Sequence, residues 1–460
     1  MTTAITPQKK IIICIDGTGN EIGDRETNVL KLYKTLDKND PDQMTHYIMG
    51  IGTYYGPQWF GQLRKMMRGF LGQTFGYGLE DDVLSAYRVI CENYVSGDTR
   101  YRNRTDRKAK REAFENDQIY ITGFSRGAYA ARMLAGFIHN FGFVDRSKLH
   151  LVAPVFRAYR QVSDSRKNAK DDLVFQSLRE YERALRPKSA PIRALLLFDT
   201  VSSLIRFRRP VRNLLSTGSI VEFGTHPSVN SNVSVRIVIQ ALAKHERRTM
   251  FRAMRWRPEM DQAEFGEEPG PLEGKPFYHG NNFRDASTKR AQYVVQRWFP
   301  GYHSDIGGSP REDESGIGKL TLLWMLDRLK EVEAEADAED NTHRDTPLPD
   351  MPLGLRLKGE GKSNGARARY LEGKVEGAKT PGGLPYIGPN PNGPLHNSFS
   401  HSIAARLWAI LEFVPKSLTR REDGPPALIR RGWLGFWYFP LFEPRHMPDE
   451  DEKDPSLDLH

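Results

Sequence analysis

The stretch QIYITGFSRGAYAARMLAGFIHN, residues 118–140, decides the fold of this chain. It begins with a short apolar run at 119–121 that has the length and composition of a buried strand. A glycine-rich turn follows, and beyond it apolar side chains recur at the spacing of one helix face: Ala130, Met133, Leu134, Phe137 and Ile138. This order predicts a strand, a tight turn and a helix.

The turn itself carries a candidate nucleophile. It reads Gly123-Phe124-Ser125-Arg126-Gly127, and a G-x-S-x-G between strand and helix is the nucleophile elbow of α/β hydrolases. A Cβ on either glycine would collide with the adjoining strand or helix, and the strained turn presents the serine hydroxyl near the helix N-terminus. We predict that Ser125 is catalytic; the alternative is an ordinary tight turn with a solvated serine.

Strands and helices alternate on the N-terminal side of the elbow. Residues 9–15 read as a central parallel strand, 27–36 as a helix, 46–52 as a strand and 79–95 as a helix. This alternation predicts an α/β fold of the α/β-hydrolase type, a doubly wound and mostly parallel sheet with large insertions over its C-terminal edge.

The alternation continues beyond the elbow. Amphipathic helices are expected near 149–162 and 172–186, strands at 192–198 and 291–299, and a helix at 320–334.

The chain is predicted to divide into three parts. Residues 1–335 form the catalytic domain, with a basic insertion near 98–112 and an excursion at 204–290, read as loops and helices outside the sheet. Residues 336–394 are acidic and then rich in glycine and proline, so they are read as a flexible surface excursion. A helical and aromatic segment, 395–460, is expected to pack on the catalytic domain.

Charge and cysteine content limit the partners and cofactors. A net charge of +9 fits an anionic partner such as a membrane surface, or simply a basic solvated surface. The basic run 98–112 reads as a solvated insertion, and with only Tyr101 among its charges we expect no nucleic-acid partner. Cys14 and Cys91 form neither a disulfide nor a metal framework, so no cofactor or metal is expected. We expect a cytoplasmic protein with no signal peptide or membrane-spanning segment.

A serine nucleophile needs a base and an acid, and in α/β hydrolases the acid and the histidine follow the serine, each after a later strand. Asp199 directly follows the strand predicted at 192–198, and His303 follows the strand predicted at 291–299. Both lie at the C-terminal rim of the sheet, where sites of such folds lie. We predict a triad of Ser125, Asp199 and His303.

Other residues compete for these roles. Asp305 is an alternative acid, although it follows no separate strand and is more suited to capping a turn. His245, on a predicted helix, and His401 are alternative bases; His396 is the second choice because it can lie near the pocket mouth. His139, at a helix end, reads as a C-terminal cap.

The oxyanion hole is expected to use backbone amides. One comes from Arg126, which follows the nucleophile, and the other from the loop after the first strand, at Gly17 or Thr18.

A helical segment between the second strand and the helix at 79–95 is a candidate lid. Trp59, Phe60, Met66 and Met67 share one face of it, with cations on the other. Such a segment can lie in a lipid interface, its cations drawn to an anionic membrane. The alternative is a helix packed on the core.

Sequence marks along most of the chain resemble a known family. They are IDGTGN near the N-terminus, GFSRGAYAAR at the elbow, LFDTV at 197–201 and WFPGYHSDIGG at 298–308. Together they resemble the α/β-hydrolase catalytic domain of type VI secretion phospholipase effectors and its uncharacterised bacterial and fungal relatives. The resemblance implies the triad Ser125, Asp199 and His303 and a lipid or acyl-ester substrate. For an effector it also implies a secretion-machinery or immunity-protein partner and delivery into a target cell.

Rival readings remain at this stage. A non-lipolytic esterase or thioesterase would use the same triad, and an interaction protein would keep the fold as a scaffold. A haloacid-dehalogenase-type phosphatase would need an aspartate where Cys14 stands, two residues before Asp16.

Overall fold

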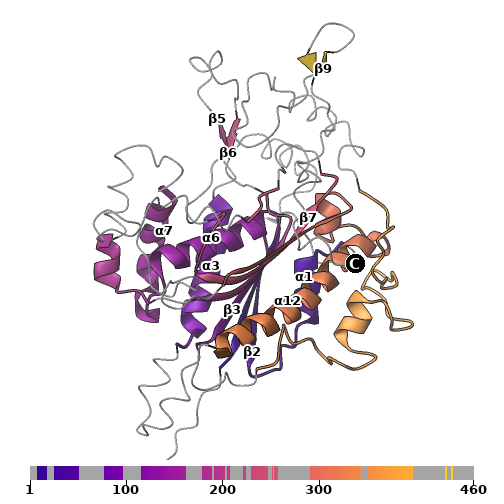
Figure 1. The fold of residues 1–460 in the computed structure, drawn as a ribbon, viewed down its shortest axis with the longest axis horizontal. Helices are drawn as coiled ribbons and strands as arrows, with labels where there is room; N and C mark the ends of the chain where they lie inside the picture. Colours follow the sequence, from indigo (N-terminus) through magenta and orange to yellow (C-terminus); the bar gives the residue numbers. More distant parts are fainter. Residues whose placement is uncertain are drawn as a thin grey trace, which may run out of the picture.

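The computed structural model describes residues 8–17, 25–50, 77–96, 116–161, 179–188, 191–201, 205–207, 221–223, 229–246, 251, 253–256, 291–342, 351–396, 430–431 and 437–438. A parallel sheet organises them (Figure 1). Its strands are β1 (Lys10–Ile15), β2 (Gln43–Ile48), β3 (Gln118–Phe124), β4 (Ile192–Phe198), β7 (Val235–Ala243) and β8 (Tyr293–Phe299). The helices are α1 (Asn28–Thr35), α3 (Tyr77–Asn93), α6 (Arg126–Phe141), η1 (Arg146–Leu151), α7 (Val152–Gln161), α11 (His303–Ile306), η3 (Glu312–Glu314), α12 (Gly316–Thr342) and η4 (Arg367–Leu371). Two short antiparallel pairs join β5 (Ile205–Phe207) to β6 (Val221–Phe223), and β9 (Arg430–Arg431) to β10 (Trp437–Tyr438).

The strand order confirms the predicted fold class. The six strands lie in the order β2-β1-β3-β4-β7-β8, and every neighbouring pair is parallel. The chain moves outward from β1 to β2 and then returns to the other side of β1 with β3. Sites in such sheets form beyond the carboxyl ends of the strands near this reversal. Every strand end there is therefore a potential source of site residues.

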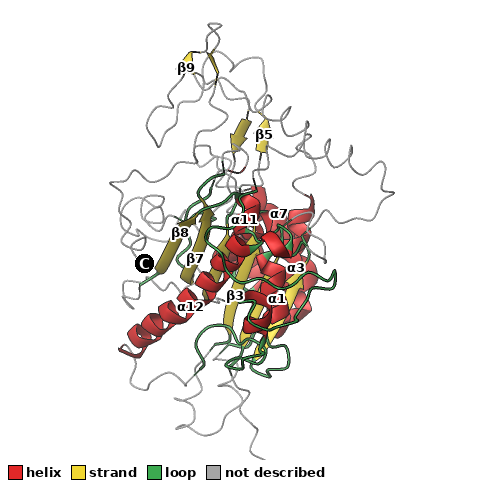
Figure 2. Cartoon of the chain, turned by 90° about the vertical axis from the view of Figure 1, so that its right-hand side faces the viewer, coloured by secondary structure: helices red, strands yellow, loops and turns green. Residues whose placement is uncertain are grey.

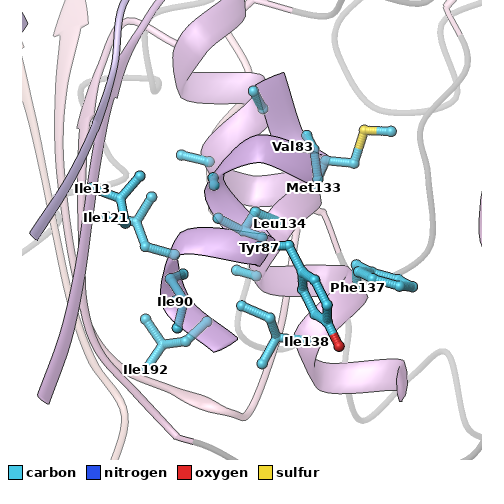
Figure 3. Packing of buried hydrophobic residues seen from close by; sticks show 14 of the residues in the cluster. Ile13, Val83, Tyr87, Ile90, Ile121, Met133, Leu134, Phe137, Ile138 and Ile192 are labelled. Carbon is cyan, nitrogen blue, oxygen red and sulfur yellow. The ribbon is translucent and has the colours of Figure 1, made fainter. Parts of the chain in front are cut away.

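Both faces of the sheet are buried, which explains the continuous apolar strands. In β1, Ile11, Ile13 and Ile15 face one core, while Ile12 and Cys14 face the other. Figure 3 shows the first core, in which Ile13 and Ile121 of the strands meet Leu134 of α6. Burying each such side chain contributes about 1.5–3 kcal/mol.

Helices cover each face. α3, α6 and α7 lie on one side of the sheet, and α1 and α12 lie on the other (Figure 1; Figure 2 shows α12 crossing the strands). α1 begins at its N-cap Thr27, whose hydroxyl accepts a hydrogen bond from the Leu30 amide. Among the described residues, no helix is long and apolar enough to cross a membrane.

The prediction that 204–290 lies outside the sheet is wrong for its middle part. β7 lies between β4 and β8, and each of its residues is buried. Its sequence, VRIVIQALA, was missed because Arg236 and Gln240 interrupt the apolar run. Both are 0% exposed, and Arg236 is neutralised by Glu339 and Asp340 of α12.

The surface excursion predicted at 336–394 also differs. α12 continues to Thr342, beyond the helix expected at 320–334, because its acidic side chains pair with arginines of the strands. In the segment 351–396, Leu355, Leu357 and Leu371 join the core on the face of the sheet that α1 and α12 cover. Most other residues of 351–396 are exposed or half-buried, so this segment lies at the surface and is anchored to the core by a few leucines.

Other boundaries shift by a few residues. The strand expected at 46–52 is β2, Gln43–Ile48, and of the helix expected at 172–186 the described part is helical at 179–185. The basic insertion 98–112 lies outside the described residues, and so does 400–412, where the sequence predicts the helix of the segment 395–460. The division of the chain into three parts stays a prediction.

Candidate active site

The elbow places Ser125 between β3 and α6. Its backbone has φ 58° and ψ −120°, a conformation that side chains with a Cβ rarely adopt and that costs of order 1–3 kcal/mol. The Ser125 amide donates to the carbonyl of Phe198 at the end of β4, 3.1 Å away. The hydroxyl makes no cap bond to the helix that it precedes. The strain thus turns the side chain away from α6.

The glycines of the elbow are required by close backbone approach. A Cβ at Gly123 would lie 2.4 Å from the carbonyl oxygen of Gly127, and a Cβ at Gly127 would lie 2.2 Å from that of Ile15. Both collisions, one with the helix and one with the neighbouring strand, are those expected from the sequence.

Ser125, His303 and Asp199 form a hydrogen-bonded chain. Nε2 of His303 lies 2.8 Å from Oγ of Ser125, and Nδ1 lies 2.7 Å from Oδ2 of Asp199. Their exposures are 8%, 6% and 0%, respectively. The three residues follow β3, β8 and β4, so the sheet alone brings together residues 178 and 104 positions apart. A hydroxyl, an imidazole and a buried carboxylate in this order can act as nucleophile, base and orienting acid.

Aromatic rings hold the imidazole in place. Phe124 stacks on the His303 ring with centroids 4.8 Å apart, and Phe251 meets it edge-on at 4.8 Å. Gly307 makes room for this stack, since a Cβ there would lie 2.1 Å from the Phe124 ring. The apolar contact also excludes water from one face of the base.

The segment after β7 anchors the loop that carries His303, a role that sequence reasoning missed. The Glu246 carboxylate, 0% exposed, accepts from the His303 amide at 3.2 Å. His245 Nδ1 accepts from the Gly301 amide at 3.0 Å, so His245 is in a loop and not on the predicted helix. The sequence offered one signal for this role: the run ALAKHERR, residues 241–248, contains both residues and is a weaker mark of the same family resemblance.

Asp199 is held in place as His303 is. Asp199 has φ 36°, and its second oxygen, Oδ1, accepts from the Ala243 amide at 3.1 Å. Nearby, Arg132 of α6, 0% exposed, donates to the Gln240 side chain of β7 at 2.8 Å. These contacts tie the elbow helix to the strand beside the acid.

Asp305 and His396 pair with each other. His396 Nδ1 lies 2.6 Å from Asp305 Oδ1, and Asp305 Oδ2 accepts from the Tyr302 amide at 2.8 Å. Asp305 therefore caps the turn that begins α11, as expected. His396 contacts this carboxylate and Glu314, and no contact links it to Ser125.

The Gly17 amide of the first-strand loop, one of the expected oxyanion donors, already has an acceptor. The Gly17 amide donates to Oδ1 of Asp16 at 2.6 Å, while Oδ2 accepts from Thr27 and Tyr47. In this structure the Gly17 amide is therefore engaged by a carboxylate.

Some predicted site residues cannot be placed. Thr18, the other loop donor, the candidate lid residues Trp59, Phe60, Met66 and Met67, and His401 all lie outside the described residues. His139, read as a helix cap, instead lies buried with Nδ1 2.6 Å from the Ser234 hydroxyl.

The comparison with known families identifies the family of this chain. Residues 9–328 match the family described as T6SS, phospholipase effector Tle1-like, catalytic domain. The chain belongs to the Tle1-like phospholipase effector family. This match confirms the resemblance drawn from IDGTGN, GFSRGAYAAR, LFDTV and WFPGYHSDIGG. It runs from β1 through the first half of α12 and includes Ser125, Asp199 and His303.

The relatives of this Tle1-like chain include an uncharacterized protein of Saccharomyces cerevisiae, 28% identical over 407 residues. That alignment covers 69% of this chain and 56% of the yeast protein, so the chain spans little more than half of its relative. A solved structure of an uncharacterized protein from Pseudomonas aeruginosa is 16% identical, covering 76% of this chain and 47% of that one, with a TM-score of 0.33. The Tle1 effector bound to the VgrG spike is 19% identical, covering 68% and 53%, with a TM-score of 0.27.

Proposed function

We propose that this protein is a serine hydrolase that cleaves carboxylic esters of membrane phospholipids. The observation that carries the proposal is the hydrogen-bonded chain from Ser125 through His303 to Asp199. Membership of a phospholipase effector family supports the lipid ester as its substrate class.

The mechanism follows from the geometry of the three side chains. Ser125 Oγ attacks the ester carbonyl carbon while its proton passes to His303 Nε2, 2.8 Å away. The tetrahedral intermediate collapses, and the leaving alcohol takes the proton from His303. Water then attacks the acyl-enzyme through the same base, which releases the fatty acid and restores the serine. Asp199, fully buried, stabilises the imidazolium in both steps.

The oxyanion is assigned to backbone amides. The Arg126 amide lies in the first turn of α6, where the helix dipole favours negative charge. Because the Gly17 amide donates to Asp16, Thr18 is the better candidate from the first-strand loop.

Replacing the nucleophile tests the proposal. Ser125→Ala should lower kcat on a phospholipid by roughly 10⁴–10⁶-fold. The melting temperature should not fall, because the substitution removes only the hydroxyl and leaves the backbone of the turn unchanged. Fatty-acid release and thermal unfolding are measured on the same preparations. Undiminished turnover in the variant would overturn the assignment.

The choice of base has its own test. His303→Ala should abolish turnover, whereas His396→Ala should retain most of it because His396 pairs with Asp305. If the two variants behaved in the opposite way, His396 would be the base.

Substrate class is tested with a panel of acyl compounds. We expect hydrolysis of long-chain phospholipids in vesicles to exceed that of short soluble esters and thioesters. The reverse preference would favour the non-lipolytic esterase, which uses the same three residues.

A partner follows from the family rather than from the site. If the chain is an effector, as its family name implies, it requires contact with a secretion apparatus and delivery to a target cell. Copurification of the chain with such machinery would support this part of the proposal. Absence of the chain from secreted fractions would overturn it.

A further inference from the structure

A cavity whose lining includes none of the three proposed catalytic residues is lined by cations. It has a volume of about 460 Å³ and lies between the end of α1 and the segment 369–386. Its lining residues are Lys34, Lys38, Arg369, Tyr370, Ala378, Lys379, Thr380, Pro381 and Tyr386. We call this cavity the basic pocket. Four of its lining side chains are cationic, and no carboxylate is among them.

The cations come from two distant parts of the chain that the fold fixes together. Leu36, just beyond α1, forms a bridge with Leu357, and the Lys358 amide donates to Thr35. One wall of the pocket contains two tyrosines that pack on each other, the Tyr370 and Tyr386 rings lying 5.0 Å apart in an edge contact. Behind them, the buried Lys319 ammonium donates to the Tyr370 carbonyl and lies 5.4 Å from the Tyr386 ring, and its charge is neutralised by Glu312 at 2.5 Å. The pocket is therefore built by the tertiary structure and not by one flexible loop.

Most of these cations lack a carboxylate partner. Lys34 pairs with Glu26, but among the described residues no ion pair neutralises Lys38, Arg369 or Lys379. Lys38 instead lies 3.9 Å from the Tyr33 ring. The pKa of Lys38 is lowered from its usual value, first by burial and further by repulsion from Lys358 and Lys34. Like charges gathered around one cavity repel each other, and a bound anion would relieve that repulsion.

The chemistry of the lining identifies the class of anion. A guanidinium offers paired donors to phosphate oxygens, ammonium groups supply point charge, and tyrosine and threonine hydroxyls donate further hydrogen bonds. A cavity of this size lies within the range of small-ligand sites, large enough for a phosphate carrying a glycerol or sugar. We propose that the basic pocket binds a phosphate-bearing group of this kind.

The pocket is separate from the proposed catalytic machinery. The pocket uses the last turn of α1 and Lys38 beyond it. The opposite end of that helix, at its N-cap Thr27, contacts Asp16 of the first-strand loop, from which the proposed oxyanion donor comes. The inference therefore does not rest on Ser125 and stands or falls by binding alone.

Binding is measured with the full chain and two forms of phosphate. Calorimetry with inositol hexakisphosphate and with inorganic phosphate tests soluble anions. Flotation with phosphatidylcholine vesicles, with and without phosphatidylglycerol, tests a lipid headgroup. We expect saturable, salt-sensitive binding in at least one arm. Binding to anionic vesicles that soluble phosphate displaces would assign the site to a headgroup, and binding of soluble phosphates alone would assign it to a free metabolite.

A matched pair of double variants separates the pocket from net charge. Arg369→Gln with Lys379→Gln should weaken binding by about tenfold or more, since two charge-assisted contacts are lost. Arg146→Gln with Lys362→Gln removes the same charge from exposed positions elsewhere and should bind as the unaltered chain does. Both variants should melt normally and hydrolyse a short soluble ester at the unaltered rate. No binding in either arm, or equal weakening in both variants, would overturn the proposal.

Discussion

At the scale of single residues, Asp199 shows how both oxygens of one carboxylate are used. Oδ2 lies 2.7 Å from His303 Nδ1, and Oδ1 accepts from the Ala243 amide. In an Asp199→Asn variant the remaining oxygen is held by that amide, so the new NH₂ group faces His303. Nδ1 must then accept a hydrogen bond from that NH₂ group and carry no proton itself, so the ring proton lies on Nε2, which can no longer act as base.

We therefore predict that Asp199→Asn lowers kcat by roughly 10⁴-fold, as in other triads. Steady-state hydrolysis checks the loss, and circular dichroism checks the fold. Asp305→Asn is the matched control: it changes a buried carboxylate two residues from His303 that does not contact the imidazole. A larger loss in the control would make Asp305 the acid.

Lys31 provides a prediction for the dependence of stability on pH. It is 4% exposed and donates to the Gly308 carbonyl at 2.9 Å, with Glu312 at 3.9 Å. Burial lowers the pKa of Lys31 to about 7, although Glu312 opposes the shift. Between that value and the ordinary lysine pKa, the unfolded chain binds more protons at this site than the folded chain. The contribution of Lys31 to stability therefore rises with pH across this window.

In urea titrations we expect the unfolding free energy to rise between about pH 7 and pH 10, by at most about 1.4 kcal/mol per pH unit from this group. Lys31→Met should flatten that rise while leaving the chain folded. The same slope in both proteins would show that Lys31 does not titrate in this range.

At the scale of elements, β7 and α12 depend on each other. Arg236 of β7 is fully buried and donates to Glu339 at 2.6 Å and to Asp340 at 2.8 Å. On β4, Arg193 pairs in the same way with Glu333 and Asp337 of α12. The helix thus supplies the charges that allow arginines inside a parallel sheet.

Arg236→Met should destabilise the protein by about 3–5 kcal/mol, because Asp340 would remain buried without its cation. Adding Asp340→Asn should recover part of that loss, which a double-mutant cycle in urea measures. Arg328→Met, which breaks an ion pair with the exposed Glu331 on the same helix, should cost no more than about 1 kcal/mol. Strict additivity of the Arg236 and Asp340 changes would contradict this coupling.

At the scale of the whole molecule, the open question is how a lipid reaches Ser125. The site lies at the carboxyl edge of the sheet, and the segment predicted to cover it contains Trp59 and Phe60. A lid that enters the lipid interface would affect vesicles and not dissolved substrates.

We predict that Trp59→Ala with Phe60→Ala weakens vesicle binding and phospholipid hydrolysis but spares a short soluble ester. Vesicle flotation, the two assays and the melting temperature are compared. Equal loss on both substrates, with a lowered melting temperature, would mean that the segment is part of the core.

The sequence by itself determined the central strands and the elbow, because the constraints there are local. A strand buried on both faces must be apolar throughout, as in Ile11–Ile15 and Leu195–Phe198. The elbow must have glycine at 123 and 127, because a backbone atom lies where each Cβ would be. The order of serine, aspartate and histidine after successive strands was also readable, because the carboxyl ends of parallel strands share one edge.

Only the tertiary structure decided the features that depend on pairs far apart in the chain. The sequence of β7 contains a charged residue, Arg236, that is compatible with a buried strand only because Asp340, 104 residues away, pairs with it. The sequence did not show that His396 pairs with Asp305, which lies 91 residues away in the chain. The basic pocket exists only because 369–386 packs beside the end of α1. In each case the role of a polar or charged side chain depends on whether a residue far away in the chain pairs with it. No local sequence pattern carries that information.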